Sequence, residues 1–156
     1  MDVIEGHLRT LTYLEENIEF IATDIVQRNA DKIIQIIQEK QLGLGLYSDG
    51  GLIGTYSQYT QDYADADNIS VPKDYGQPYN FQWTGSTFSK MLLNADESGN
   101  NYSIFTRDKK QQLLKDIYGS DLFKLTEANN TLVNETIIEP ELIIYIEENW
   151  WRLDTQ

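Results

Sequence analysis

The sequence predicts an α+β protein: N-terminal helices, a long Gly/aromatic-rich loop, a β-hairpin or small antiparallel sheet, and C-terminal helices. Three observations lead to this class. Apolar residues recur at helical spacing near both ends of the chain. Seven of the ten glycines fall between positions 43 and 85. A turn-rich tetrad, 97–100, separates two short segments of strand-like composition.

The first quarter of the chain is predicted to form two helices. In the first, apolar side chains recur with a period of about 3.6 residues, and acidic residues occupy the rest of the helical wheel. This apolar set is Ile4, Leu8, Leu11, Ile18, Ile21 and Ile25. A second helix is expected from about Asn29, which with Asp31 is a candidate N-cap, to a stop at Gly43.

Residues 43–85 are predicted to be a long structured loop. Their glycines, together with Pro72 and Pro78, favour turns and irregular backbone over regular elements. A loop of this length inside one domain is often functional. Its aromatic residues are too numerous for a solvated linker, so we expect the loop to pack on its own domain or on a neighbour. They are Tyr47, Tyr56, Tyr59, Tyr63, Tyr75, Tyr79, Phe81 and Trp83.

A β-hairpin is expected next, because residues 89–96 and 101–107 flank the tetrad. Met91, Leu93 and Ile104 are candidates for its buried face.

Helices are predicted to complete the chain. Asp108 is a candidate N-cap for a helix through Tyr118, and Thr126 begins another capping signal. Pro140 fits the first turn of a last helix. The apolar residues of that helix are Leu142, Ile143, Ile146 and Trp150.

Length and composition narrow the possible functions. The 156 residues are the size of one domain, 1–156. A formal charge of −13, from 12 Lys and Arg against 25 Asp and Glu, argues against binding nucleic acid or an anionic membrane by charge. The absence of cysteine excludes disulfides and thiol catalysis. Without a signal-like N-terminus or an apolar run of the roughly 20 residues that cross a bilayer, a soluble protein made in a cytoplasm is expected.

No catalytic, cofactor or metal site is predicted. His7, the only histidine, lacks a nucleophile motif, so a structural or surface role is favoured over a triad base. Adjacent acids such as Glu15 and Glu16, or Glu147 and Glu148, point in different directions on a helix. The glycines at 43–45 and 50–54 lack the Gly-Lys-Ser/Thr ending of a phosphate loop.

Two charged clusters have alternative explanations. The first is an acidic cluster of Asp62, Asp65, Asp67 and Asp74. It could offer oxygen ligands to a cation, but it lacks the order of residues of an EF-hand, and a solvated acidic loop is favoured. The second is the one local basic patch, which either meets an acidic partner surface or is ordinary solubilising charge. It comprises Arg107, Lys109, Lys110 and Lys115.

The middle of the chain resembles the tail-completion, or virion-morphogenesis, proteins of tailed bacteriophages. Residues 47–60, YSDGGLIGTYSQYT, are similar to the family stretch D-x-x-G-x-x-W/Y-x-x-L/Y-S-x-x-T. Residues 83–90, WTGSTFSK, are similar to its D-T-G-x-L/F-x-x-S element, although Trp83 replaces the acid. Residues 123–129, FKLTEAN, are similar to its F-x-L-T-x-E-x segment. The resemblance spans about 41–146 and keeps the order of elements, but the basic residues between the first two motifs are reduced mainly to Lys73.

This resemblance implies a virion structural protein without catalytic residue or cofactor. Such domains assemble as rings at the portal–neck–tail junction, with loops contacting adjacent subunits. The expected partners are other copies and other neck, portal or tail proteins. DNA passes through such a lumen without sequence-specific contacts, and negative charge would keep it from sticking. The motif and expected contact residues are Asp49, Gly50, Gly54, Tyr56, Ser57, Thr60, Gly76, Pro78, Thr84, Gly85 and Phe88.

Two other functions remain open from the sequence. A small acidic inhibitor, such as a DNA mimic or an immunity-type protein, would suit the negative charge. However, the charge is scattered, about −8 over residues 1–78 and −5 over the rest. A hydrolase using paired carboxylates rests only on the presence of Asp and Glu.

Overall fold

The computed structural model describes residues 3–96 and 101–153, with side chains through residue 150. The elements are α1 (Val3–Arg28), α2 (Ala30–Lys40), a 3₁₀ turn (Leu42–Leu44), α3 (Gln58–Ala66), α4 (Ser86–Ser89), β1 (Met91–Ala95), β2 (Tyr102–Thr106), α5 (Gln111–Tyr118), α6 (Glu127–Val133), a π-helical segment (Asn134–Ile138) and α7 (Glu139–Leu153). This is the predicted α+β class with helices at both ends.

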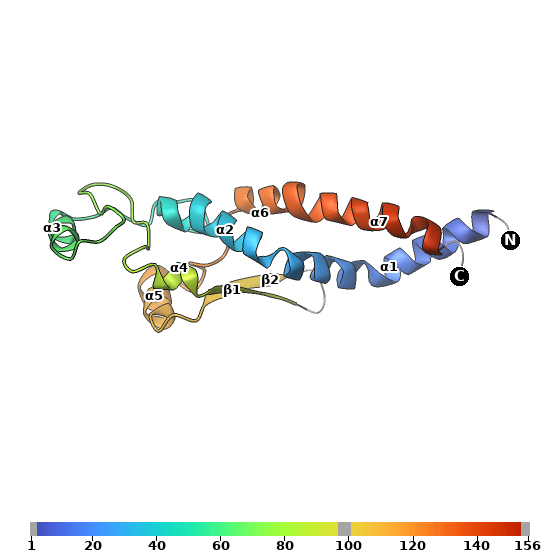
Figure 1. Ribbon diagram of the computed structural model, residues 1–156, viewed down its shortest axis with the longest axis horizontal. Coiled ribbons are helices and arrows are strands. Elements are labelled where there is room, and N and C mark those ends of the chain that lie inside the picture. Colours follow the sequence, from blue (N-terminus) through green and yellow to red (C-terminus); the bar gives the residue numbers. More distant parts are fainter. Residues whose placement is uncertain (1–2, 97–100, 154–156) are drawn as a thin grey trace.

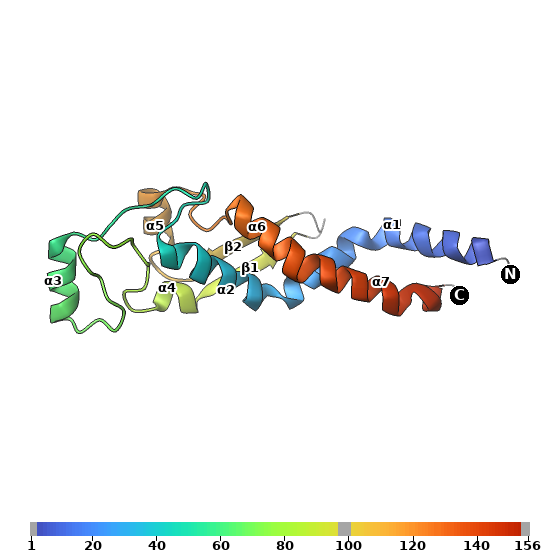
Figure 2. The same ribbon diagram turned by 90° about the horizontal axis from the view of Figure 1, so that it is seen from above.

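The molecule is elongated (Figures 1 and 2). α1 and α7 lie side by side at the end that carries both termini, and α3 lies at the opposite end. The β1–β2 hairpin runs along α1 and α2. We call α1 together with α7 the stem.

The hydrophobic core lies where α2, the hairpin and α6 meet. Met91, Leu93 and Ile104 are all buried in it, as predicted, and Leu93 pairs directly with Ile104 across the antiparallel hairpin. The predicted turn 97–100 lies outside the described residues. The buried core residues are Val26, Ile33, Ile34, Ile37, Leu42, Met91, Leu93, Ile104, Leu122, Phe123, Leu125, Val133 and Ile137.

The apolar stripe of α1 is buried over only part of its length. Ile21 and Ile25 are buried, but Ile4, Leu8 and Leu11 are 65%, 57% and 53% exposed. At this end, the buried residues of α1 are small ones, Gly6 and Thr10. They lie on a different face of α1 from Ile4, Leu8 and Leu11. Periodicity predicts which side chains share a face, but the tertiary structure decides whether that face is covered.

Asn29 makes the junction between α1 and α2 without Gly or Pro. It holds the N-cap position of α2, but its side chain does not cap the helix. Instead, its Nδ2 donates to the Ile25 carbonyl at 2.9 Å, and its Oδ1 accepts from the Lys32 ammonium at 2.8 Å. Asp31 lies within the first turn and is not the cap.

The predicted stop of α2 at Gly43 is wrong by two residues. The helix ends at Lys40 with Gln41 as its C-cap, and the chain continues into the 3₁₀ turn, which closes at Gly45. Gly45 has a φ of 70°, a left-handed conformation that favours glycine.

Gln41 connects the end of α2 to the start of α6. Its side chain is fully buried. The Nε2 atom donates to the Lys124 carbonyl at 2.8 Å. The Oε1 atom accepts from the Thr126 amide at 2.9 Å and from Asn129 Nδ2 at 3.3 Å. One amide therefore satisfies three polar groups in the core.

Replacing Gln41 by Ala should destabilise the fold strongly. The change leaves the buried Thr126 amide and the part-buried Lys124 carbonyl without this partner, so we expect the free energy of unfolding to fall by roughly 2–4 kcal/mol. Urea titration followed by circular dichroism measures it. The matched control is Gln35→Ala, because Gln35 bonds only Glu39 on the exposed side of α2. A Gln41 variant as stable as this control would contradict the role assigned to Gln41.

The 43–85 segment contains more regular structure than predicted. Residues 58–66 form α3 rather than irregular backbone. The Ser57 side chain caps this helix by accepting from the Thr60 amide. The glycine-based prediction failed here because residues 58–66 contain no glycine or proline, so the local sequence favours a capped helix.

One of the two N-caps predicted for the C-terminal helices is wrong and the other is confirmed. Asp108 is not the N-cap of α5, which is Lys110, and the Asp108 carboxylate instead accepts from the Lys110 amide in the preceding turn. Thr126 caps α6 as predicted, with its hydroxyl accepting from the Asn129 amide.

α6 and α7 form one continuous helical run instead of two separate helices. The π-helical segment lies just before Pro140, and the Glu139 amide donates to the Asn134 carbonyl across this wider turn. Proline has no amide hydrogen to donate, so a local widening lets the helix continue through it.

Candidate functional site

Residues 54–56, in the first motif-like segment, pair with residues 76–79, which lie before the second segment at 83–90. The Tyr56 amide donates to the Gln77 carbonyl at 2.9 Å, and the Gly76 amide donates to the Tyr56 carbonyl at 2.9 Å. The Tyr79 amide donates to the Gly54 carbonyl at 3.0 Å. A side chain at Gly54 would collide with the Tyr79 ring, since an added Cβ would lie 2.6 Å from it. Residues 54–56 and 76–79 therefore form one ordered unit.

A polar network centred on Asn80 holds this unit together. The Asn80 Oδ1 atom accepts from the Tyr56 hydroxyl at 2.9 Å and from the Lys73 ammonium at 2.7 Å. Lys73 also donates to the Gln82 carbonyl at 3.1 Å. Its Nζ lies 5.5 Å from the centroid of the Tyr56 ring.

Lys73 is a buried cation bound by neutral oxygens. Lys73 is only 2% exposed, and this burial lowers the pKa of its ammonium group. Burial likewise raises the pKa of the Tyr56 phenol. Among the described residues, Lys73 forms no ion pair with a carboxylate.

The hydroxyls of Ser57 and Thr84 bind close to their own positions in the chain, whereas the Ser86 hydroxyl reaches Asp108 in the turn before α5. Ser57 Oγ lies 3.0 Å from Thr60 Oγ1, and both belong to the start of α3. Thr84 Oγ1 accepts from the Ser86 amide at 3.4 Å. The loop contacts the core through the apolar side chains of Ile53 and Phe81, and Phe88 of α4 packs against the core as well.

The remaining motif residues serve two separate turns. Asp49 Oδ1 accepts from the Gly51 amide at 2.8 Å, in a turn where Gly50 has a φ of 83°. Gly85 begins α4 with a φ of 74°. The structure therefore does not bring the Asp49–Gly50 turn into the paired unit.

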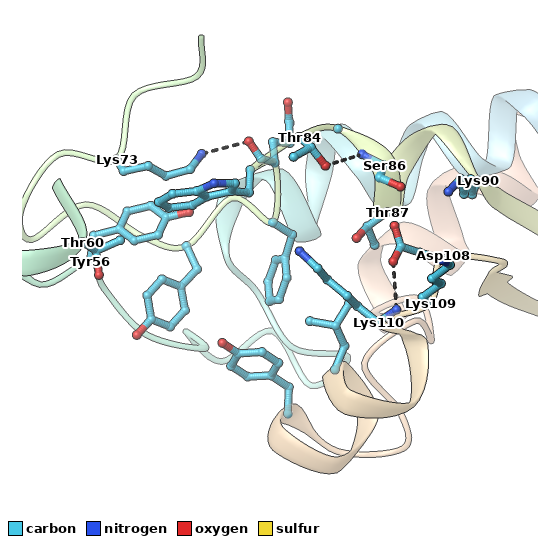
Figure 3. A pocket seen from close by; sticks show the side chains of 17 residues that line it. Tyr56, Thr60, Lys73, Thr84, Ser86, Thr87, Lys90, Asp108, Lys109 and Lys110 are labelled. Carbon is cyan, nitrogen blue, oxygen red and sulfur yellow. Dashed lines mark hydrogen bonds between the residues drawn. The ribbon is translucent and has the colours of Figure 1, made fainter. Parts of the chain in front are cut away.

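A cavity of about 620 Å³ lies between this unit, α4 and the turn before α5 (Figure 3). Lys73 is on one side, and Lys90, Lys109 and Lys110 are on the other. We call it the lysine pocket. Its walls are aromatic and include Tyr56, Tyr79, Phe81, Trp83 and Tyr118. Four of the twelve Lys and Arg residues of an acidic chain line this one cavity, with Asp108 as its single carboxylate.

Asp108 is held by groups of the pocket wall. Hydrogen bonds from the Ser86 side chain and from the Lys110 backbone amide lower the pKa of its carboxyl, and the charges of Lys90 and Lys110 act in the same direction. Lys90, Lys109 and Lys110 form no ion pair within the described part of the chain. Their positive charge therefore faces the cavity largely uncompensated.

Replacing Asp108 by Asn should change how stability depends on pH. A carboxyl whose folded pKa lies below its unfolded value of 3.8 contributes stability above pH 3.8, and that contribution is lost as the pH falls further. We expect Asp108→Asn to be less stable than the wild type at pH 7, with the difference narrowing below pH 3.8. Urea midpoints at pH 7, 4 and 3 measure this difference. Asp67→Asn removes the same charge from the exposed end of α3 and is the control. A constant difference across this pH range would contradict the assignment.

The other sequence candidates do not converge on a site. His7 packs against Trp150, with ring centroids 5.5 Å apart, and so links α1 to α7. Among residues 3–96 and 101–153, no group of three or more His, Asp or Glu side chains is arranged to hold a metal. Of the basic patch, Lys109 and Lys110 line the lysine pocket, whereas Lys115 lines a separate hollow near β2.

Within the described residues, no helix combines the length and apolar character needed to cross a bilayer.

Comparisons with protein-family models, with curated proteins and with solved structures return no match to this chain.

Sequence reasoning missed the lysine pocket because its parts are far apart in the chain. Lys73, Lys90 and Lys109 come from a loop, the end of α4 and the turn before α5. The aromatic density of residues 43–85 was the one available signal, and it indicated packing but not a pocket.

Proposed function

We propose that this protein is a structural component of the neck or head–tail junction of a tailed bacteriophage. It assembles as a ring that joins the portal or neck to the tail and completes the tail. It is made in the host cytoplasm and acts in the virion, and it needs neither a cofactor nor a catalytic residue. Its partners are further copies of itself and other neck, portal or tail proteins.

The observation that carries this proposal is the uncovered apolar stripe of the stem. Ile4, Leu8 and Leu11 are spaced at i, i+4 and i+7, so they share one face of α1. Each is more than half exposed. Covering side chains exposed to this degree is worth roughly 1 kcal/mol each, since full burial gives about 1.5–3 kcal/mol. A neighbouring subunit would supply that cover.

Two further features support the proposal. The three motif-like segments keep the order of the tail-completion family along residues 41–146. The loop that contains the first of them is ordered within the single chain by the Asn80 network. A preformed loop loses little conformational entropy when a neighbour binds it, which favours assembly.

The charge of the chain suits a ring through which DNA passes. A net charge of −13 repels phosphates, so DNA would move through the lumen without binding.

The experiment is light scattering on the purified protein, alone and mixed with candidate portal and tail components. We expect a mass that is a multiple of 18.0 kDa, or incorporation into a large symmetric complex. Replacing Leu8 and Leu11 by Gln should weaken this association by roughly ten-fold or more, because it removes the apolar stripe. Phe20→Gln is the control. Phe20 is 72% exposed but lies nine residues beyond Leu11, about two and a half turns, and so on the opposite face of α1.

Two results would contradict the proposal. One is association of the Leu8/Leu11 variant that equals that of the Phe20 variant. The other is a monomer that ignores portal and tail components and binds one basic protein tightly. That second result would favour the acidic-inhibitor function instead.

A further inference from the structure

The lysine pocket carries a net positive charge on a strongly negative protein. Lys90, Lys109 and Lys110 face it without ion pairs in the described residues, and Lys73 is buried in its wall without a carboxylate. Asp108 compensates only part of this charge, because it is one carboxylate among four lining lysines. The pocket therefore favours a ligand that brings carboxylates.

The pocket also favours an apolar group beside those carboxylates. Five aromatic rings contribute to its walls, and Tyr79 and Phe81 both pack edge-on against Tyr118. A volume of about 620 Å³ accommodates several side chains. Aromatic surface of this kind gains from contact with aliphatic side chains, whereas a lone small anion would leave it wet.

The stem carries the complementary pattern on α7. Ile143 and Ile144 are 55% and 50% exposed. Glu147 lies four residues after Ile143, and Glu148 lies four residues after Ile144. Both glutamates are also exposed. Residues at i and i+4 lie on the same helical face, so each isoleucine has a carboxylate beside it one turn further on.

One chain cannot make this contact with itself. Figures 1 and 2 place the later turns of α7 at the end with the termini, away from α4 and α5, which border the pocket. The two surfaces are different, so a contact between copies is head-to-tail, the type that closes into a ring when the rotation between copies permits.

We propose that the lysine pocket binds the Ile143–Glu148 face of α7 from a second copy of this chain. The Glu147 and Glu148 carboxylates would pair with Lys109 and Lys110, and the isoleucines would contact the aromatic walls. This inference rests on the proposed ring function and names the contact that builds the ring.

A charge exchange tests the proposal on the full chain. The pocket variant is Lys109→Glu with Lys110→Glu, and the helix variant is Glu147→Lys with Glu148→Lys. Sedimentation velocity over a range of concentrations measures self-association. We expect each variant alone to associate roughly ten-fold or more weakly than the wild type. An equimolar mixture should regain association, because each variant then meets the opposite charge on the other.

The variants are chosen so that unfolding of the chain does not explain a loss of self-association. Glu at 109 and 110 lies just before the N-terminus of α5, and Lys at 147 and 148 lies toward the C-terminus of α7. Negative charge near a helix N-terminus and positive charge toward a helix C-terminus both interact favourably with the helix dipole. The matched control for the pocket variant is Lys40→Glu with Lys124→Glu, which makes the same change in net charge at exposed positions outside the pocket. It should associate like the wild type.

The outcomes separate this inference from the proposed function. Rings that persist in the pocket and helix variants overturn the inference and leave the proposed function standing. Variants that dissociate but do not recover on mixing overturn the second copy as the occupant. A wild type that is monomeric alone but enters a complex with portal or tail components overturns the inference only. A wild type that neither self-associates nor enters a complex with portal or tail components overturns both the inference and the proposed function.

Discussion

The buried amide of Gln41 is the interaction on which the arrangement of this protein depends. It lies where α2 ends, and it binds the backbone on both sides of the turn that leads into α6. Segments more than eighty residues apart in the chain are thereby fixed at one point. Because Gln41, Thr126 and Asn129 are buried, the alternative to these bonds is unsatisfied donors and acceptors in the core. The direction of α6, and with it the continuous run into α7, follows from this point.

A second polar centre, Asn80, organises the opposite part of the molecule. Its side chain accepts hydrogen bonds from Tyr56 and Lys73, which are separated along the loop, and Lys73 also donates to the Gln82 carbonyl. These bonds, which all lie within the loop, hold residues 54–82 together. The motif residues of this region serve mainly to build the loop. Any surface that the loop presents to a neighbour is therefore shaped before binding, not during it.

Two features of the chain remain uncompensated within it. The side chains of Ile4, Leu8 and Leu11 are more than half exposed, and the lysine pocket has four lysines against the single carboxylate of Asp108 among its lining residues. Both occur on a protein whose own surface is rich in carboxylates. Association with further copies would compensate both features, and this is the reason for proposing an assembling subunit.

The sequence by itself determined most of the local elements, although α3 and the cap of α5 were missed. Helical periodicity, the Thr126 cap and the alternation of Met91 and Leu93 indicated the others, because each depends on neighbours within a few residues. The tertiary structure alone decided the rest: that Leu8 stays exposed while Ile25 is buried, that Gln41 is a core residue, and that lysines from three segments share one pocket. These depend on which surfaces meet across long stretches of chain, and a pattern confined to one segment carries no information about its partner.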